Sequence, residues 1–150
     1  KLDERYHLVI AGEPYGDFSG YQRQLGAAPR RGHIHLHDRF ITDPEVAAFF
    51  GAADAVVLPY KSATQSGVTA IAYHFGVPVI ATDVGGLREA LNNGRTGVLV
   101  PEVSAGAVEE GIKRFFDMDP SVLRANIAAL REELSWKRFA DGLVDFAGRI

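Results

Sequence analysis

The centre of the chain holds its most informative pattern: Pro59-Tyr60-Lys61-Ser62-Ala63-Thr64-Gln65-Ser66-Gly67-Val68, a mostly apolar run to Phe75, and then Gly76-Val77-Pro78-Val79-Ile80-Ala81-Thr82. This order predicts a buried strand, a loop of small polar residues, a helix and a second buried strand. Small residues at a helix entrance let main-chain N–H groups of the first turn, which lack intrahelical partners, approach an anion closely. We therefore expect a phosphate cradle and a ligand that carries a pyrophosphate.

Strands and helices are expected to alternate along the whole chain. The pattern predicts strands over residues 6–12, 34–40, 55–59, 78–82 and 97–100, and helices over 19–25, 42–51, 66–75, 85–91, 104–116, 121–134 and 135–149. This order is typical of an α/β fold, here a Rossmann-like doubly wound parallel sheet with helices on both faces and a helical C-terminal tail. Ligands of such sheets bind beyond the carboxyl ends of the strands, so the site is expected in loops 12–15, 38–41, 60–67 and 82–86.

Composition sets the class of protein. A length of 150 residues, with 47% hydrophobic and 23% charged residues, fits one soluble domain over residues 1–150. The net charge of −3 argues against broad electrostatic capture of nucleic acid, and no apolar run is long enough for a transmembrane segment. The chain has no cysteine, which fits a reducing compartment. We expect a cytoplasmic protein.

Five segments, in this order and spacing, resemble the carboxyl-terminal half of a family 4 (group 1) glycosyltransferase of the GT-B architecture. They are Ile10-Ala11-Gly12-Glu13, Ser62-Ala63-Thr64-Gln65-Ser66-Gly67, Gly76-Val77-Pro78-Val79-Ile80-Ala81-Thr82, Asp83-Val84-Gly85-Gly86-Leu87-Arg88-Glu89 and Asn93-Gly94-Arg95-Thr96-Gly97. The resemblance covers nearly the whole chain. It implies a nucleotide-sugar-binding domain that serves retaining transfer of a sugar from an NDP-sugar to an acceptor hydroxyl, without an obligatory metal or another cofactor.

The resemblance also implies roles for individual residues. The residues expected to bind the donor diphosphate and sugar are Lys61, Thr64, Gln65, Ser66, Gly67 and Val68. Those expected to bind the nucleobase are Arg39, Phe40 and Ile41. The residues expected to flank the site are Gly12, Glu13, Gly85, Gly86, Arg88 and Glu89. Lys61 and Arg88 are the local cations that could stabilise a leaving diphosphate, since its negative charge grows as the glycosidic bond breaks. No catalytic residue is assigned.

Two departures from the family pattern stand out. The family usually carries two glutamates around this helix. Ile71 occupies the position of the one that typically holds the donor ribose. Gln65 lies near the position of the other, and it could hydrogen-bond a hydroxyl but brings no charge. The family's donor half normally begins with a further strand and helix that bear an Arg and a Lys for the diphosphate, and an amino-terminal acceptor domain precedes it. We expect this chain to be part of a longer protein, inactive alone, and any membrane association to arise from the acceptor domain.

Each assignment has a structural alternative. Residues 62–67 could form only a tight connection, Gly85 and Gly86 could supply only unusual backbone angles, and Glu89 could cap its own helix. His33, His35 and His37 would share one face of a strand, but solvated histidines are more common than ligands, and we assign no metal. Aromatic spacing predicts core positions for Phe49, Phe50, Phe75, Phe115, Phe116 and Phe139, and a packing anchor at Trp136.

Two other functional interpretations stay open. One is a nucleotide-sugar epimerase or an inactive donor-binding half with the same fold. The other is a receiver-like signalling module, suggested by Lys61 after a strand. A receiver needs paired acids and a phosphoacceptor Asp, whereas Glu13 has no acidic neighbour and Pro59-Tyr60-Lys61 lacks an Asp.

Overall fold

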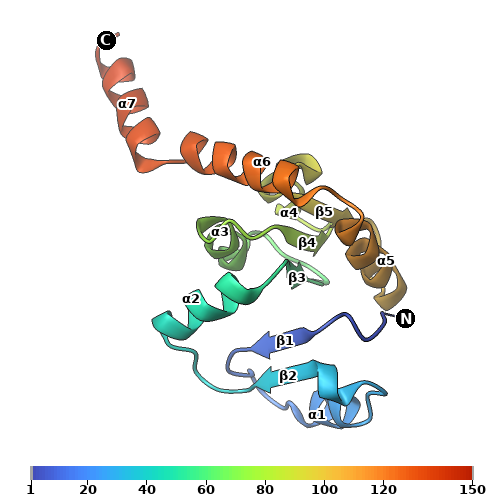
Figure 1. Cartoon of the computed structure of the whole chain (residues 1–150). Coiled ribbons are helices and arrows are strands. Elements are labelled where there is room, and N and C mark those ends of the chain that lie inside the picture. Colours follow the sequence, from blue (N-terminus) through green and yellow to red (C-terminus); the bar gives the residue numbers. More distant parts are fainter. Residues whose placement is uncertain (1, 150) are drawn as a thin grey trace. The chain divides into compact units, whose positions relative to one another are not determined.

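The computed structural model describes residues 2–149 (Figure 1). Five strands alternate with helices in the predicted order. The strands are β1 (Leu8–Ala11), β2 (Ile34–His37), β3 (Val56–Leu58), β4 (Val79–Thr82) and β5 (Gly97–Val100). The α-helices are α1 (Ser19–Gly26), α2 (Asp43–Ala52), α3 (Gly67–His74), α4 (Leu87–Ala90), α5 (Ala105–Phe116), α6 (Pro120–Glu133) and α7 (Trp136–Ala147), with short 3-10 helices η1 (Arg31–His33) and η2 (Asn92–Gly94).

The strands pair in parallel within two compact units. Unit 1, residues 1–52, holds a two-stranded sheet in which Leu8 of β1 is paired with Ile34 of β2. Unit 2, residues 53–150, holds a three-stranded sheet of order β3-β4-β5, in which Val79 of β4 is paired with Val56 and with Gly97. The predicted α/β class with parallel strands and flanking helices is confirmed, and the strands divide between two sheets.

The core of unit 2 centres on β4, whose four residues are all buried. Ile80 faces Val98, Val100 and Phe115, so α5 covers this face of the sheet (Figure 1). Gly111 makes the close packing possible, because a Cβ at that position would lie 2.5 Å from Val100 Cγ2. A strand buried on both faces is what a continuously apolar sequence such as that of β4 predicts.

Several predicted core aromatics lie at the surface instead. Phe115 is buried and Phe49 and Phe50 are half-buried, but Phe75, Phe116 and Phe139 are 37%, 50% and 58% exposed. Trp136 is 84% exposed and contacts Phe139 edge to face, with ring centroids 5.9 Å apart. The prediction that Trp136 anchors the last helix is therefore wrong for this structure. Helical spacing places Trp136 and Phe139 on one face of α7, but α7 has no buried residue among those described.

The predicted second strand is shorter at its carboxyl end, and it begins after a 3-10 turn. His33 ends η1, His35 is exposed in β2, and His37 is half-buried with its ring 4.9 Å from that of Phe49. The three histidines therefore do not share one strand face. No helix among the described residues has the length and apolarity needed to cross a membrane.

Candidate functional site

In unit 2, the loop after β3 lies directly against the loop after β4. Gly85 has φ +54°, and a Cβ at this position would lie 1.6 Å from the carbonyl oxygen of Ala63. A Cβ on Gly86 would lie 2.4 Å from the carbonyl oxygen of Thr64. Only glycine permits this approach of two main chains, and a positive φ is strained for other residues. The two glycines thus supply both an unusual backbone angle and the room for the loop of residues 62–66.

Thr82, the last residue of β4, ties the same two loops together by a hydrogen bond. Its Oγ1 donates to the carbonyl oxygen of Tyr60 at 2.6 Å, and the side chain is fully buried. A buried hydroxyl with a good acceptor holds its partner firmly, because breaking the bond would leave a desolvated donor unpaired. The base of the loop after β3 is therefore fixed to the most buried strand of the sheet.

This loop leads to the amino-terminus of α3, which no side chain caps. Ser66 has the extended backbone of an N-cap residue, with φ −137° and ψ 114°, but its side chain accepts no bond from the helix. Thr64, Gln65 and Gly67 are exposed, and a Cβ on Gly67 would meet nothing within 4 Å. Of the first-turn N–H groups, that of Thr69 donates to the Ser66 carbonyl oxygen at 3.2 Å, whereas those of Gly67 and Val68 have no partner among the described residues and carry partial positive charge at the helix entrance.

The two predicted cations differ in their surroundings. Arg88 forms an ion pair with Asp83, so its charge is already partly balanced. Lys61 is exposed and forms no ion pair or hydrogen bond with the residues that the structure describes. Glu89 is exposed on α4, and the residue that begins that helix, Gly86, has no side chain that could cap it. Lys61 is therefore the better placed of the two to meet an added negative charge.

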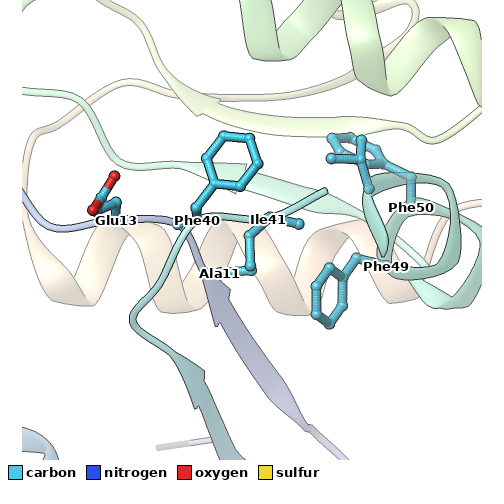
Figure 2. Close-up of a pocket in the computed structure, with 8 residues that line it drawn as sticks. Ala11, Glu13, Phe40, Ile41, Phe49 and Phe50 are labelled. Atoms are coloured by element: carbon cyan, nitrogen blue, oxygen red, sulfur yellow. The ribbon is translucent and has the colours of Figure 1, made fainter. Parts of the chain in front are cut away.

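Unit 1 contains a pocket of about 300 Å³ that is lined by two of the three predicted base-binding residues (Figure 2). Phe40 and Ile41 follow β2, Gly12 and Glu13 follow β1, and two rings come from α2. The residues that line it are Ala11, Gly12, Glu13, Phe40, Ile41, Val46, Phe49 and Phe50. The volume is at the lower end of the range for small-molecule sites, and apolar lining with few polar groups is typical of them.

Arg39, the third predicted base-binding residue, is held outside this lining. Its guanidinium pairs with Glu45 and donates to the carbonyl oxygen of Phe40 at 2.9 Å. Glu45 also accepts from the backbone N–H of Thr42 at 3.0 Å and from its hydroxyl at 2.8 Å. Bonds from Arg39 and from Thr42 lower the pKa of Glu45 to about 2. The sequence signal for Glu45 was available, because Thr42-x-x-Glu45 at a helix start is a capping-box pattern.

The histidines of unit 1 contact one another. His7 Nδ1 lies 3.2 Å from His35 Nε2, and the His7 ring is 4.6 Å from that of His33. Among the residues described, no group of three or more His, Cys, Asp or Glu side chains is arranged to hold a metal ion.

Comparison with known proteins identifies the class. The fold is that of GT-B glycosyltransferases: sucrose-phosphate synthase from Thermosynechococcus elongatus superposes with a TM-score of 0.64 and 25% identity, over 95% of this chain and 37% of that one. The glycosyltransferase WaaG, of lipopolysaccharide biosynthesis, shares the fold at a TM-score of 0.56 and 19% identity, over 87% of this chain and 43% of that one.

The family follows from the sequence comparison. The model for "Glycosyl transferases group 1" matches residues 1–118, and the chain belongs to this family. A D-inositol 3-phosphate glycosyltransferase from Pseudarthrobacter chlorophenolicus is 38% identical over 136 residues, which cover 89% of this chain and 32% of that protein. The protein of that name from Corynebacterium aurimucosum is 31% identical, over 94% of this chain and 34% of its own length. The chain therefore spans about a third of the length of these curated relatives. Family membership favours the glycosyltransferase interpretation over the receiver-like module.

Proposed function

We propose that this chain is the donor-binding half of a retaining group 1 glycosyltransferase, which holds a nucleotide-diphosphate sugar while the sugar passes to an acceptor hydroxyl. The observation that carries the proposal is the uncapped entrance of α3, held in place by the loop after β4. Residues 64–68 would bind the diphosphate and sugar through main-chain N–H groups and short side chains. Anion binding at a helix amino-terminus needs only free amides and close approach, and Gly67 leaves room for both.

This arrangement suits the departure of a nucleoside diphosphate. As the bond between the sugar and the diphosphate breaks, negative charge grows on the diphosphate, and oriented amides stabilise that charge with little reorganisation. Lys61 would add a positive charge beside the loop. Arg88 would contribute less because Asp83 shares its charge. No metal is needed in this scheme, since the helix amides and Lys61 take the place of a cation.

The pocket of unit 1 is the proposed site for the nucleobase. Phe40 is 70% exposed, so its ring offers a face for stacking at the rim, while Ile41 and the α2 rings provide an apolar wall. Glu13 is the one ionisable residue among those lining the pocket, and its carboxylate could accept a hydrogen bond from a base N–H or a ribose hydroxyl. Arg39 would support the wall indirectly, through its bonds to Glu45 and to the Phe40 carbonyl.

A second candidate function rests on Ile71, which is 41% exposed on α3 where the family usually places a ribose-binding glutamate. An aliphatic side chain cannot accept the ribose hydroxyls, so the full protein could be a nucleotide-sugar epimerase or an inactive donor-binding half. Assay of the full-length protein with radiolabelled NDP-sugar separates these functions. Transfer to an acceptor supports the transferase, and conversion of the sugar without acceptor supports the epimerase.

Isothermal titration calorimetry of the chain with UDP, GDP and ADP tests the donor-site proposal directly. We expect one nucleotide to bind more tightly than the others, with the free nucleoside and inorganic pyrophosphate each retaining part of its affinity. The acceptor domain is not needed for this measurement. Absence of binding by all three nucleotides up to millimolar concentration would contradict the proposal.

A further inference from the structure

Three of the five histidines gather at one end of the sheet in unit 1. His7 directly precedes β1, and its Nδ1 lies 3.2 Å from Nε2 of His35 in β2, so that one imidazole can donate a hydrogen bond to the other. The ring centroid of His33 lies 4.6 Å from that of His7. His7 and His35 are exposed, and both rings are therefore accessible from solvent.

The distance between the two ring nitrogens fits a metal ion that binds both of them. Imidazole nitrogens bind Zn²⁺ at about 2.0–2.1 Å. Two bonds of that length, to nitrogens 3.2 Å apart, enclose an angle of about 100° at the metal, which lies between the square-planar and the tetrahedral values. The rings must turn so that both nitrogens face the ion, and the broad χ2 torsion of an exposed histidine permits this.

His33 adds a second observation at this place. It is half-buried, and its Nδ1 is buried without a hydrogen-bond partner among the described residues. A buried polar atom without a partner is uncommon in native proteins, and a bound ion is one of its recognised causes. The protein therefore does not satisfy all the imidazole nitrogens gathered here by its own hydrogen bonds.

We propose that His7 and His35 bind one divalent transition-metal ion of the zinc class, which links the start of β1 to β2. Imidazole ligands suit zinc, copper and nickel, whereas magnesium and calcium prefer oxygen. The inference does not depend on the proposed function. Gly12 and Glu13 follow β1 and line the pocket, whereas His7 precedes β1, so the ion lies at the other end of the strand and takes no part in sugar transfer.

A link between the strands would matter in unit 1 because little else holds its sheet. None of residues 2–52 is buried, and a sheet of two strands is marginally stable by itself. His7 and His35 are 28 residues apart, so an ion that joins them also closes a long loop, which costs the unfolded chain entropy. An ion that binds the folded state alone stabilises it by mass action.

Titration calorimetry with Zn²⁺ tests the site on the chain purified without a polyhistidine tag. We expect one Zn²⁺ per chain with a Kd on the order of 10–100 μM, weaker than a structural site with four ligands, and no binding of Mg²⁺. At a Zn²⁺ concentration one hundred times the Kd, the Tm should rise by about 5 °C, and EDTA should reverse the rise. Absence of Zn²⁺ binding up to millimolar concentration would overturn the proposal.

Histidine variants locate the bound ion. His7→Ala and His35→Ala should each raise the Kd for Zn²⁺ about a hundredfold, because the remaining imidazole binds without a linked second ligand. His74→Ala is the matched control, since His74 is exposed at the end of α3 in unit 2, and this variant should keep the Kd of the unaltered chain. Unchanged binding in His7→Ala or in His35→Ala would refute the site.

NMR spectroscopy of the unaltered chain provides a measurement that does not depend on the folding of a variant. Zn²⁺ should shift the ring proton signals of His7 and His35 and leave those of His37 and His74 in place. Equal shifts of all the histidines would show unspecific binding and contradict the proposal. A lower Tm of His7→Ala, combined with no response of the unaltered chain to Zn²⁺, would show that the pair is only a hydrogen bond.

Discussion

Replacing Gly67 with valine should abolish diphosphate binding while the fold is kept. Gly67 is the first residue of α3, its φ is not positive, and a Cβ there would meet nothing within 4 Å. The valine side chain would therefore extend into the space that the phosphate must enter. In a helix, valine is intrinsically favoured over glycine by a few tenths of a kcal/mol, so the free energy of unfolding should change by less than about 0.5 kcal/mol.

The loss of affinity follows from the hydrogen bonds at stake. Each bond from an amide to a charged phosphate oxygen contributes about 1.5–3 kcal/mol, and displacing the phosphate from the helix entrance would cost at least one of them. Since about 1.4 kcal/mol corresponds to a factor of ten, the Kd should rise by roughly tenfold to a hundredfold for one lost bond, and binding should vanish if two are lost.

Gly106→Val provides the control for this experiment. Gly106 lies in the first turn of α5, and a Cβ there also meets nothing within 4 Å. Titration calorimetry with UDP and urea unfolding of both variants gives the comparison. We expect both to unfold like the unaltered chain and only Gly67→Val to lose affinity. A Gly67→Val protein that folds and binds UDP with unchanged Kd would refute the assignment of the α3 entrance.

Three further predictions concern other parts of the chain. Gly85→Ala should destabilise unit 2 by about 2–4 kcal/mol in urea unfolding, because the new methyl group would overlap the Ala63 carbonyl and φ is +54°; a stability loss below 0.5 kcal/mol would show that the loop moves freely. The pKa of Glu45 is lowered from 4.5 to about 2, so its carboxylate contributes stability that is present above pH 4.5 and is lost as the pH falls to 2. Between these two pH values, the free energy of unfolding should therefore fall less in Glu45→Gln than in the unaltered chain. Equal pH profiles of the two proteins would contradict this. Trp136, the one tryptophan of the chain, should be quenched by acrylamide as readily as a free indole, since it is 84% exposed; a protected, blue-shifted emission would show that it is buried.

The element order could be predicted because local signals set it. β5 coincides with its predicted span of residues 97–100, since an Asn-Gly turn precedes it and Pro101 follows, and β4 was evident from four consecutive apolar or β-branched residues. The entrance of α3 was likewise evident from small polar residues before an apolar run. Pairing of the strands into two sheets depends on contacts between distant segments, which no local pattern specifies.

The errors also have a physical cause. The spacing of Phe139 identifies the apolar side of α7, but not whether anything covers it. On α5, Phe115 and Phe116 are neighbours in the sequence, and only Phe115 lies on the side that packs against the sheet. The pair of Arg39 and Glu45 was not predicted, because the capping-box pattern places Glu45 against Thr42 but does not specify a second partner for its carboxylate. The contact of Gly85 with Ala63 lies between loops about twenty residues apart, and only coordinates could reveal it.

The position of the α3 entrance depends on β4 more than on its own loop. Thr82, Gly85 and Gly86 all belong to one short segment at the carboxyl end of this strand, and each fixes a different part of the loop after β3. Because the loop is held at its base by the buried strand, its exposed amides are already placed before a ligand arrives, which reduces the entropy lost on binding. In the free protein those amides can bond to water, so leaving them uncapped costs little. A loop fixed at its base and open at its tip can therefore bind an anion without giving up the stability of the sheet.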